Sequence, residues 1–399
     1  MALHYSDPVQ FEPLLPTNRL DELVETTRSV FERSSALKAS ASPEARSALR
    51  DIVRSMNSYY SNRIEGQATH PVHIAKALNN DFSDTPDIAR RQRLALAHMG
   101  AEAELEPLVT TEASALTSAF ARLAHQKLYE RLQDSDRELD DGTLLLPGEL
   151  RTREVQVGRH FAPAWQSVPR FLARMDQRYG DVGGVDRVLF TIASAHHRMA
   201  WTHPFADGNG RAVRLQTHCA LLPFSAGLWS VNRGLARNRD QYYAMLAGAD
   251  APRQGDLDGR GNLSERQLWA WCKWFVELCE DQVTFMSAMM DLHTLRDRVA
   301  AYVVVKGRAE GIKEYREECI LALQTVATSG ALSRGDFVRM TGLGERTGRA
   351  CLSRFLKDGL LRPAGDESHR SEVGIGFPIS SLNVLFPSLY PEAATAVID

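Results

Sequence analysis

The chain has 399 residues, a formal net charge of −3 and 24% charged residues, which is the profile of a soluble globular protein with room for two or three domains. This balance excludes a strongly basic nucleic-acid-binding protein but leaves a local basic patch open. The sequence shows no apolar stretch long enough to span a bilayer, no signal peptide and no Cys-x-x-Cys pair, so we expect a cytoplasmic protein without a membrane partner.

Residues 1–109 are predicted to form an N-terminal helical region. Ser42 and Pro43 are typical of a helix start, and apolar residues follow them at the three-four spacing of an amphipathic helix. Gly66 is typical of a helix end. Helical patterns resume over residues 71–108, with one break.

Residues 110–300 are predicted to form a second, larger helical region. Its helical patterns cover residues 110–132, 185–200, 211–222, 240–246 and 263–300. Polar and apolar residues alternate over 154–158, which indicates a short strand inside an exposed hairpin at 150–162. The sequence therefore predicts a mainly α protein with one small β element in this region.

Residues 314–399 are predicted to form a small separate domain. Three helical patterns, at 315–328, 333–341 and 344–357, precede two short strands at 360–363 and 373–377. This order resembles a winged helix-turn-helix. The third helix carries Arg346 and Arg349, which can contact DNA phosphates, but nearby acidic residues weaken the positive field. Contact with DNA therefore stays open.

The most informative segment is His-Pro-Phe-Ala-Asp-Gly-Asn-Gly-Arg-Ala-Val-Arg at residues 203–214. His203 can accept a proton near neutral pH, and Asp207 can hold a divalent metal ion. The Gly-Asn-Gly turn directs backbone N–H groups at an anion, and the Asn side chain can add a further donor. Two arginines can follow on the first turn of a helix and bind phosphate oxygens. The residues predicted to contact a polyphosphate are Gly208, Asn209, Gly210, Arg211 and Arg214.

This segment resembles, at every defining position, the Fic-family motif His-x-Phe-x-Asp/Glu-Gly-Asn-Gly-Arg-x-x-Arg. The resemblance implies a Fic-type helical bundle that transfers AMP from ATP to a Ser, Thr or Tyr hydroxyl of a target protein, or to the protein itself. It implies that His203 is the general base, that Asp207 binds Mg²⁺, and that the loop and arginines bind ATP. Tyr242 and Tyr243 resemble a tyrosine pair beside the family's adenine pocket, and Asp250 is a further candidate there.

Two more segments resemble functional parts of the family. The strand at 154–158 resembles the flap that pairs with the main chain of the target, an example of strand addition, and its docking residues would be Val155, Gln156, Val157 and Gly158. The pattern Ser61-x-x-x-Glu65-Gly66 resembles the family's inhibitory motif. We expect Glu65 to pair with Arg214, which should hold the γ-phosphate of ATP, and so to inhibit transfer within the same chain.

Several alternatives remain open at this stage. The family also contains members that remove AMP from a modified protein with the inhibitory glutamate. The site could transfer another phosphate-containing group, or the chain could be a DNA-binding regulator that senses nucleotide without transferring it. The residues do not identify the target protein or exclude a homo-oligomer.

Overall fold

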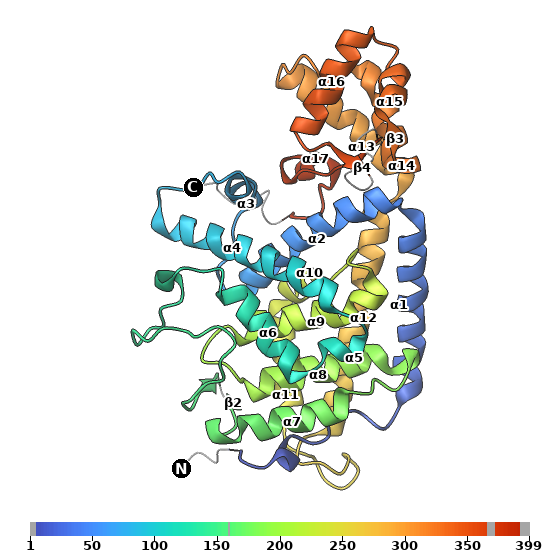
Figure 1. Cartoon of the computed structure of the whole chain (residues 1–399). Helices are drawn as coiled ribbons and strands as arrows, with labels where there is room; N and C mark the ends of the chain where they lie inside the picture. Colours follow the sequence, from blue (N-terminus) through green and yellow to red (C-terminus); the bar gives the residue numbers. More distant parts are fainter. Residues whose placement is uncertain (1–4, 159, 365–371, 392–399) are drawn as a thin grey trace.

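A computed structural model describes residues 5–158, 160–364 and 372–391 of the chain (Figure 1). The fold is mainly α, as expected. Helices of the N-terminal half are α1 (Leu20–Ser40), α2 (Pro43–Ile64), α3 (Pro71–Leu78), α4 (Pro86–Leu105), α5 (Glu112–Ala115), α6 (Ser118–Tyr129), α7 (Val168–Tyr179) and α8 (Val188–Thr202). Those of the C-terminal half are α9 (Asn209–Ser225), α10 (Asn232–Arg237), α11 (Arg239–Ala249), α12 (Glu265–Met289), α13 (Leu292–Val304), α14 (Ile320–Ser329), α15 (Arg334–Met340), α16 (Glu345–Lys357) and α17 (Leu382–Leu385).

The strands are short and form two separate sheets. A hairpin joins β1 (Gln156–Val157) to β2 (His160–Phe161), and a three-stranded antiparallel sheet contains β3 (Leu332–Ser333), β4 (Leu361–Ala364) and β5 (Glu372–Ile375) in the order β3-β5-β4. The described residues contain no helix that is both long and apolar enough to cross a membrane.

Helices α8 and α9 lie at the centre of the larger part of the molecule. Nearly every residue of α8 is buried, and α8 packs against α9, α7 and α12. Helix α9 also contacts α5 and α6, while α1 packs along α12 at the side (Figure 1). The loop that joins α8 to α9 contains the motif identified in the sequence, so packing on several sides holds both of its ends.

Helix α2 begins and ends as the sequence predicts. The side chain of Ser42 accepts a hydrogen bond from the N–H of Ala45 (3.2 Å), and Pro43 occupies the first turn. Gly66 has φ +74°, and the N–H groups of Gly66 and Gln67 donate to the carbonyls of Arg63 and Asn62. These bonds form a Schellman motif, which favours glycine at the left-handed position.

Two helical patterns that continue in the sequence are interrupted in the structure. The stretch 110–132 divides into α5 and α6 because the side chain of Thr117 caps the N–H of Phe120 (3.1 Å) and starts a new helix. The stretch 263–300 divides into α12 and α13, where Asp291 caps the N–H of Thr294 (3.0 Å). Helix α13 packs against α14 and α17, so it associates with the C-terminal helices.

The C-terminal helices and their sheet sit above α2 (Figure 1). The sheet has three strands where two were expected, because the two-residue β3 pairs with β5. Part of the segment between the two expected strands, residues 365–371, lies outside the described residues. Hydrogen bonds fasten this unit to α2: Tyr60 Oη donates to Leu389 O (2.8 Å), and Tyr390 Oη donates to Ser55 Oγ (3.1 Å).

Candidate functional site

The loop between α8 and α9 has a left-handed residue at each end. His203 follows α8 with φ +47°, and Gly208 precedes α9 with φ +74°. A Cβ atom at position 208 would overlap the hydroxyl of Tyr129, and one at Gly210 would lie 2.5 Å from Glu65 Oε1. Backbone conformation and the ring of Tyr129 therefore require glycine at 208, whereas at 210 a larger residue would displace the Glu65 carboxylate.

Asn209 closes this loop onto itself. Its Oδ1 accepts the N–H of Phe205 (2.9 Å), and its Nδ2 donates to the carbonyl of Phe205 (2.8 Å). These two bonds use only one of the two N–H groups of the amide, so the expected contact of Asn209 with a phosphate stays a prediction. The N–H groups in the first turn of α9 have no acceptor within the helix and remain suited to an anion.

His125, from α6, supports the loop from behind. Its ring stacks on Phe205 with the ring centroids 4.1 Å apart. Nδ1 accepts the N–H of Gly148 (2.9 Å), so Nε2 carries the proton and donates to the carbonyl of Asp207 (3.1 Å). Burial lowers the pKa of His125 to about 4, which keeps the ring neutral. His125 was not predicted from the sequence, because no motif near position 125 marks it.

His203 is mostly enclosed by protein, and burial lowers its pKa to about 4. The imidazole is therefore neutral at pH 7, as a general base must be. Its backbone is held by Arg151, a second residue that was not predicted from the sequence. Arg151 Nε donates to the carbonyl of His203 (2.8 Å), and the backbone N–H of Arg151 donates to Pro204 O (2.9 Å).

Arg151 also ties the loop to the hairpin. Its Nη1 donates to Arg153 O (2.9 Å) and its Nη2 to Pro163 O, one carbonyl on each side of β1 and β2. The guanidinium is buried, and desolvation lowers the pKa of Arg151. One buried cation thus fixes the position of the hairpin relative to His203.

The expected hairpin is present at β1–β2. Gln156 pairs with Phe161 and Val157 with His160, and Gly158 makes the turn with φ +59°. Three of the four residues expected to dock a target, Gln156, Val157 and Gly158, are exposed, whereas Val155 is half-buried and accepts the N–H of Ala162 (3.3 Å). The arrangement offers a short exposed strand near the loop.

The C-terminal end of α2 reaches the same site from the opposite side. Arg214 Nη2 lies 2.6 Å from Glu65 Oε1, Nε donates to Ser61 Oγ (3.0 Å), and Nη2 also donates to Ser61 O (3.2 Å). The side chain of Arg214 is 1% exposed and that of Glu65 is 30% exposed. Desolvation opposes the charge on Glu65, but the attraction of Arg214 and Arg211 outweighs it and lowers the pKa of Glu65. The expected contact between Glu65 and Arg214 is therefore present.

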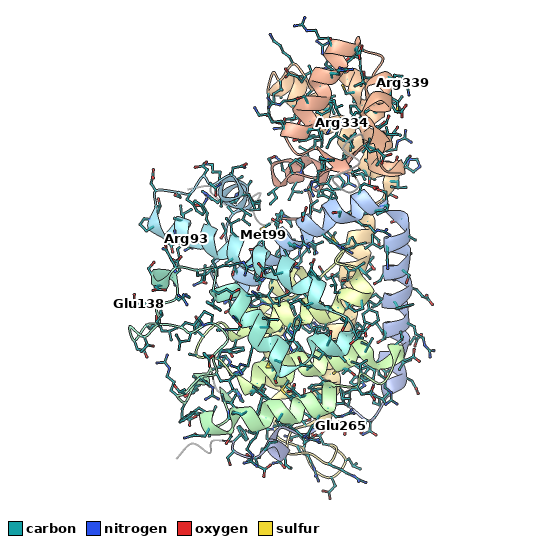
Figure 2. The ribbon with its side chains drawn as sticks, viewed as in Figure 1. Arg93, Met99, Glu138, Glu265, Arg334 and Arg339 are labelled. Carbon is teal, nitrogen blue, oxygen red and sulfur yellow. The ribbon has the colours of Figure 1, made fainter. Side chains whose placement is uncertain are left out.

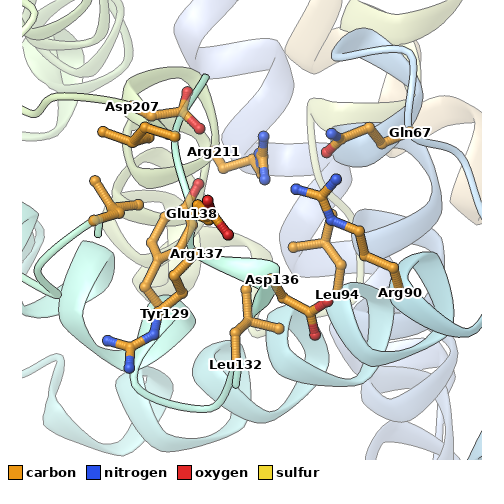
Figure 3. A pocket seen from close by; sticks show the side chains of 12 residues that line it. Gln67, Arg90, Leu94, Tyr129, Leu132, Asp136, Arg137, Glu138, Asp207 and Arg211 are labelled. Atoms are coloured by element: carbon orange, nitrogen blue, oxygen red, sulfur yellow. The ribbon is translucent and has the colours of Figure 1, made fainter. Parts of the chain in front are cut away.

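A small pocket of about 40 Å³ opens beside the loop (Figure 3). Asp207 and Arg211 line one side, and Gln67 and Arg90 line the other, with the two guanidinium groups directed toward one another. Among the described residues, Arg211 Nε has no hydrogen-bond partner although it is buried. An unpaired arginine atom beside an exposed carboxylate fits a polyphosphate carrying a divalent cation.

The remaining candidates differ in their surroundings. Tyr242 is buried, hydrogen-bonds His196 Nε2 (2.8 Å) and packs against Trp271 and Trp274, so its ring belongs to the core. Tyr243 is exposed, and its Oη donates to Ile64 O (3.4 Å) at the end of α2. Asp250 lies 3.1 Å from His197 Nε2.

Comparison with known proteins identifies the region that contains the loop. Residues 115–221 match the family model described as Fic/DOC family. The chain is 30% identical over 141 residues, 33% of its length, to a protein named Protein adenylyltransferase Fic from Drosophila mojavensis, and the match covers only 26% of that relative. A crystal structure of a Fic family protein from Desulfovibrio desulfuricans shares the fold, with a TM-score of 0.53, 20% identity, and coverage of 90% of this chain and 96% of that chain.

Proposed function

Residues 115–221 form a Fic domain, and from this we propose that the protein transfers AMP from ATP to a Ser, Thr or Tyr hydroxyl of a target protein or of itself. One observation carries the proposal. The start of α9 is surrounded by the neutral imidazole of His203, the exposed carboxylate of Asp207 and the buried guanidinium groups of Arg211 and Arg214. These groups could serve as the base, the metal ligand and the phosphate contacts of nucleotidyl transfer.

His203 would accept the proton of the target hydroxyl. The hydroxyl oxygen then forms a bond to the α-phosphorus of ATP, the bond between that phosphorus and the bridging oxygen breaks, and pyrophosphate leaves with the electron pair. The low pKa of His203 makes the ring a weak base, so its task is to hold the hydroxyl in line and take the proton as the new bond forms.

Asp207 would hold the Mg²⁺ that accompanies ATP, because its carboxylate is exposed at the pocket and its carbonyl is fixed by His125. The metal ion supplies neutralisation of the phosphate charge. Gly208, Gly210 and the backbone of Asn209 would contact the phosphates, and Arg211 has a free donor for them. Tyr243 is the better candidate for packing on the adenine, since Tyr242 is enclosed by the core.

We further propose that Glu65 inhibits the transfer. The carboxylate occupies the end of the Arg214 guanidinium, where it would repel a γ-phosphate. Ser61 holds the same guanidinium, and Gly66 ends α2 so that Glu65 lies one residue beyond its last turn. ATP that binds in the presence of Glu65 would be displaced from the geometry needed for in-line attack.

The hairpin would order the target. An extended segment can add to the exposed strand through main-chain hydrogen bonds. Arg151 fixes the position of that strand relative to His203. Recognition of this kind reads little side-chain identity, so the acceptor hydroxyl would be selected mainly by its distance from the paired segment.

The decisive experiment is intact-protein mass spectrometry of the Glu65→Gly variant incubated with ATP and Mg²⁺. The proposal predicts a mass increase equal to AMP on the variant or on an added target, and no increase when His203→Ala is combined with Glu65→Gly. ATP binding by the double variant without any transfer is the expected control result. If Glu65→Gly binds ATP but yields no AMP adduct on itself or on any protein of a cell lysate, transfer of AMP is refuted.

Removal of AMP is the second candidate for the same site. The observation that favours it is that Glu65 lies beside the loop in a charged state, where a carboxylate can activate water. An AMP-modified substrate separates the two activities: Glu65→Gly would abolish removal and increase addition.

For the C-terminal unit we propose a winged helix-turn-helix fold, supported by its helix order and three-stranded sheet. Its arginines are largely paired with acids, as in Arg349 with Glu345 and Arg339 with Asp336. Arg334 and Arg339 mark this unit in Figure 2. DNA binding here predicts an affinity that falls steeply with salt in a filter-binding assay, and a salt-independent result would exclude it.

A further inference from the structure

A buried group of ionisable side chains lies behind the nucleotide site. Glu102 comes from α4, Glu106 begins the short 3-10 helix Glu106–Leu108, and His218 comes from α9. All three are buried, and each offers one ligand atom within 4.8 Å of the others. Glu102 and Glu106 are one helical turn apart, so their side chains share one face.

The separations match the edges of a metal coordination sphere. His218 Nε2 lies 3.2 Å from Glu106 Oε1 and 3.3 Å from Glu102 Oε1. Donors bound tetrahedrally to Zn²⁺ at about 2.0–2.1 Å stand roughly 3.4 Å apart. The contact of His218 with Glu106 is a hydrogen bond at the long end of the usual N–H···O range of about 2.7–3.2 Å, and a bound ion would replace it. The carboxylates and the imidazole therefore stand at metal-ligand spacing.

Among the described residues, Glu102 and two residues that contact it have buried polar atoms without a hydrogen-bond partner. Among the described residues, Glu102 Oε2 and Asn57 Oδ1 have no hydrogen-bond partner although both are buried. The fully buried ring of His98, one turn before Glu102 on α4, also lacks a partner at both nitrogens within the part of the chain that is described, and its Nδ1 lies 3.8 Å from Glu102 Oε2. Each unmet buried group carries a cost of about 1–3 kcal/mol, so unmet groups on Glu102 and on its neighbours favour a bound ligand at this place.

The outer groups are placed as supports for metal ligands. Arg54 pairs with Glu106 Oε2, which leaves Oε1 for a metal ion. Asn57 Nδ2 donates to Glu102 Oε1 (2.8 Å) and lies 3.3 Å from His218 Nδ1.

We propose that Glu102, Glu106 and His218 bind a divalent transition-metal ion of the Zn²⁺ class. One imidazole and two carboxylates suit Zn²⁺ better than Mg²⁺ or Ca²⁺, which prefer oxygen ligands and retain water. This site is separate from Asp207, which faces the pocket on the surface. Because the ligands come from α4, its following turn and α9, and are supported from α2, the ion would join three elements of the core.

The position of this site also bears on the inhibitory contact, a consequence that rests on the proposed function. Asn57 and Ser61 are one turn apart on α2, and His218 and Arg214 are one turn apart on α9. The contacts Asn57–His218 and Ser61–Arg214 are therefore successive contacts between the same two helices. A bound ion would tighten the docking of α2 and strengthen inhibition by Glu65.

The test is metal uptake by the full-length protein, stripped with a chelator and titrated with Zn²⁺ alone. An Asp207→Ala background removes the surface carboxylate, so uptake there reports the buried site. The expected result is one equivalent of Zn²⁺, and for Co²⁺ a visible spectrum typical of a four-coordinate site. X-ray absorption of the Zn²⁺-loaded protein should show nitrogen and oxygen ligands at about 2.0–2.2 Å and no sulfur. Absence of stoichiometric uptake by the folded protein would overturn the proposal, as would sulfur ligation.

Matched variants locate the site. Glu102→Gln should weaken Zn²⁺ binding more than about 100-fold, beyond the 10–100-fold effect usual for outer groups. Glu104→Gln changes an exposed glutamate of the same helix and should leave uptake unchanged. Equal affinity in both variants would refute the assignment. Because uptake is measured without nucleotide, it succeeds or fails independently of AMP transfer.

Discussion

Replacing Glu65 with glycine is the sharpest test of how α2 controls the site. The substitution removes a charge-assisted hydrogen bond of 2.6 Å to a guanidinium that is 1% exposed. Such bonds contribute about 1.5–3 kcal/mol. At 1.4 kcal/mol per factor of ten, loss of this bond would lower the equilibrium preference for the inhibited arrangement by about 10- to 150-fold. Since 30% of the Glu65 side chain is exposed, we expect the lower part of that range, about 10- to 30-fold faster labelling.

The assay is incorporation of label from ATP carrying radioactive phosphorus at the α position, read on the protein itself and on added targets. Glu65→Gln keeps the length of the side chain but removes its charge, so it should fall between the wild type and Glu65→Gly. Glu65→Gly should also lower the free energy of unfolding, because Arg214 keeps only its bonds to Ser61. ATP with Mg²⁺, at a hundredfold excess over Kd, should raise the free energy of unfolding of the variant by about 2.7 kcal/mol. Equal labelling of variant and wild type, with ATP shown to bind by calorimetry, would refute the inhibitory contact.

Three further predictions concern the loop and its supports. Because burial lowers the pKa of His203 to about 4, the neutral base persists as pH falls from 8 to 5, so kcat/KM of the Glu65→Gly variant should decline only near pH 4; a midpoint between pH 6 and 7 would contradict this. Arg151→Ala removes a donor from three backbone carbonyls and should reduce transfer to a target at least tenfold while ATP binding, measured by calorimetry, changes little; parallel loss of both would indicate general unfolding. Asn209→Ala breaks both bonds to Phe205, so ATP affinity should fall by about 1–3 kcal/mol, and an unchanged Kd would show that the loop is held by other contacts.

Local patterns predicted much of the fold. The start and end of α2 follow from Ser42, Pro43 and Gly66, whose preferences act through hydrogen bonds to residues within a few positions. The hairpin at β1–β2 was likewise expected from the alternation of polar and apolar residues. The division of the long helical patterns was missed at Thr117 and Asp291, because the apolar spacing continues across both caps and outweighed them.

The candidate site could be predicted only in part. The motif around His203 lies in twelve consecutive residues, and the partnership of Glu65 with Arg214 followed from two recognisable segments. The bonds of Asn209 to Phe205 were not predicted, because an amide suited to phosphate is equally suited to the backbone of its own loop. Only the structure shows these backbone partners.

The order of residues along the chain thus determined which helices form, where several of them begin and end, and which loop carries the chemistry. Tertiary packing alone decided that His125 and Arg151 support that loop, and that Glu102, Glu106 and His218 meet in the interior. The physical reason is the separation along the sequence of the residues that make each contact. Helix caps and tight turns depend on neighbours within about one turn, whereas these contacts join side chains from separate helices or loops, and their meeting depends on how whole elements pack.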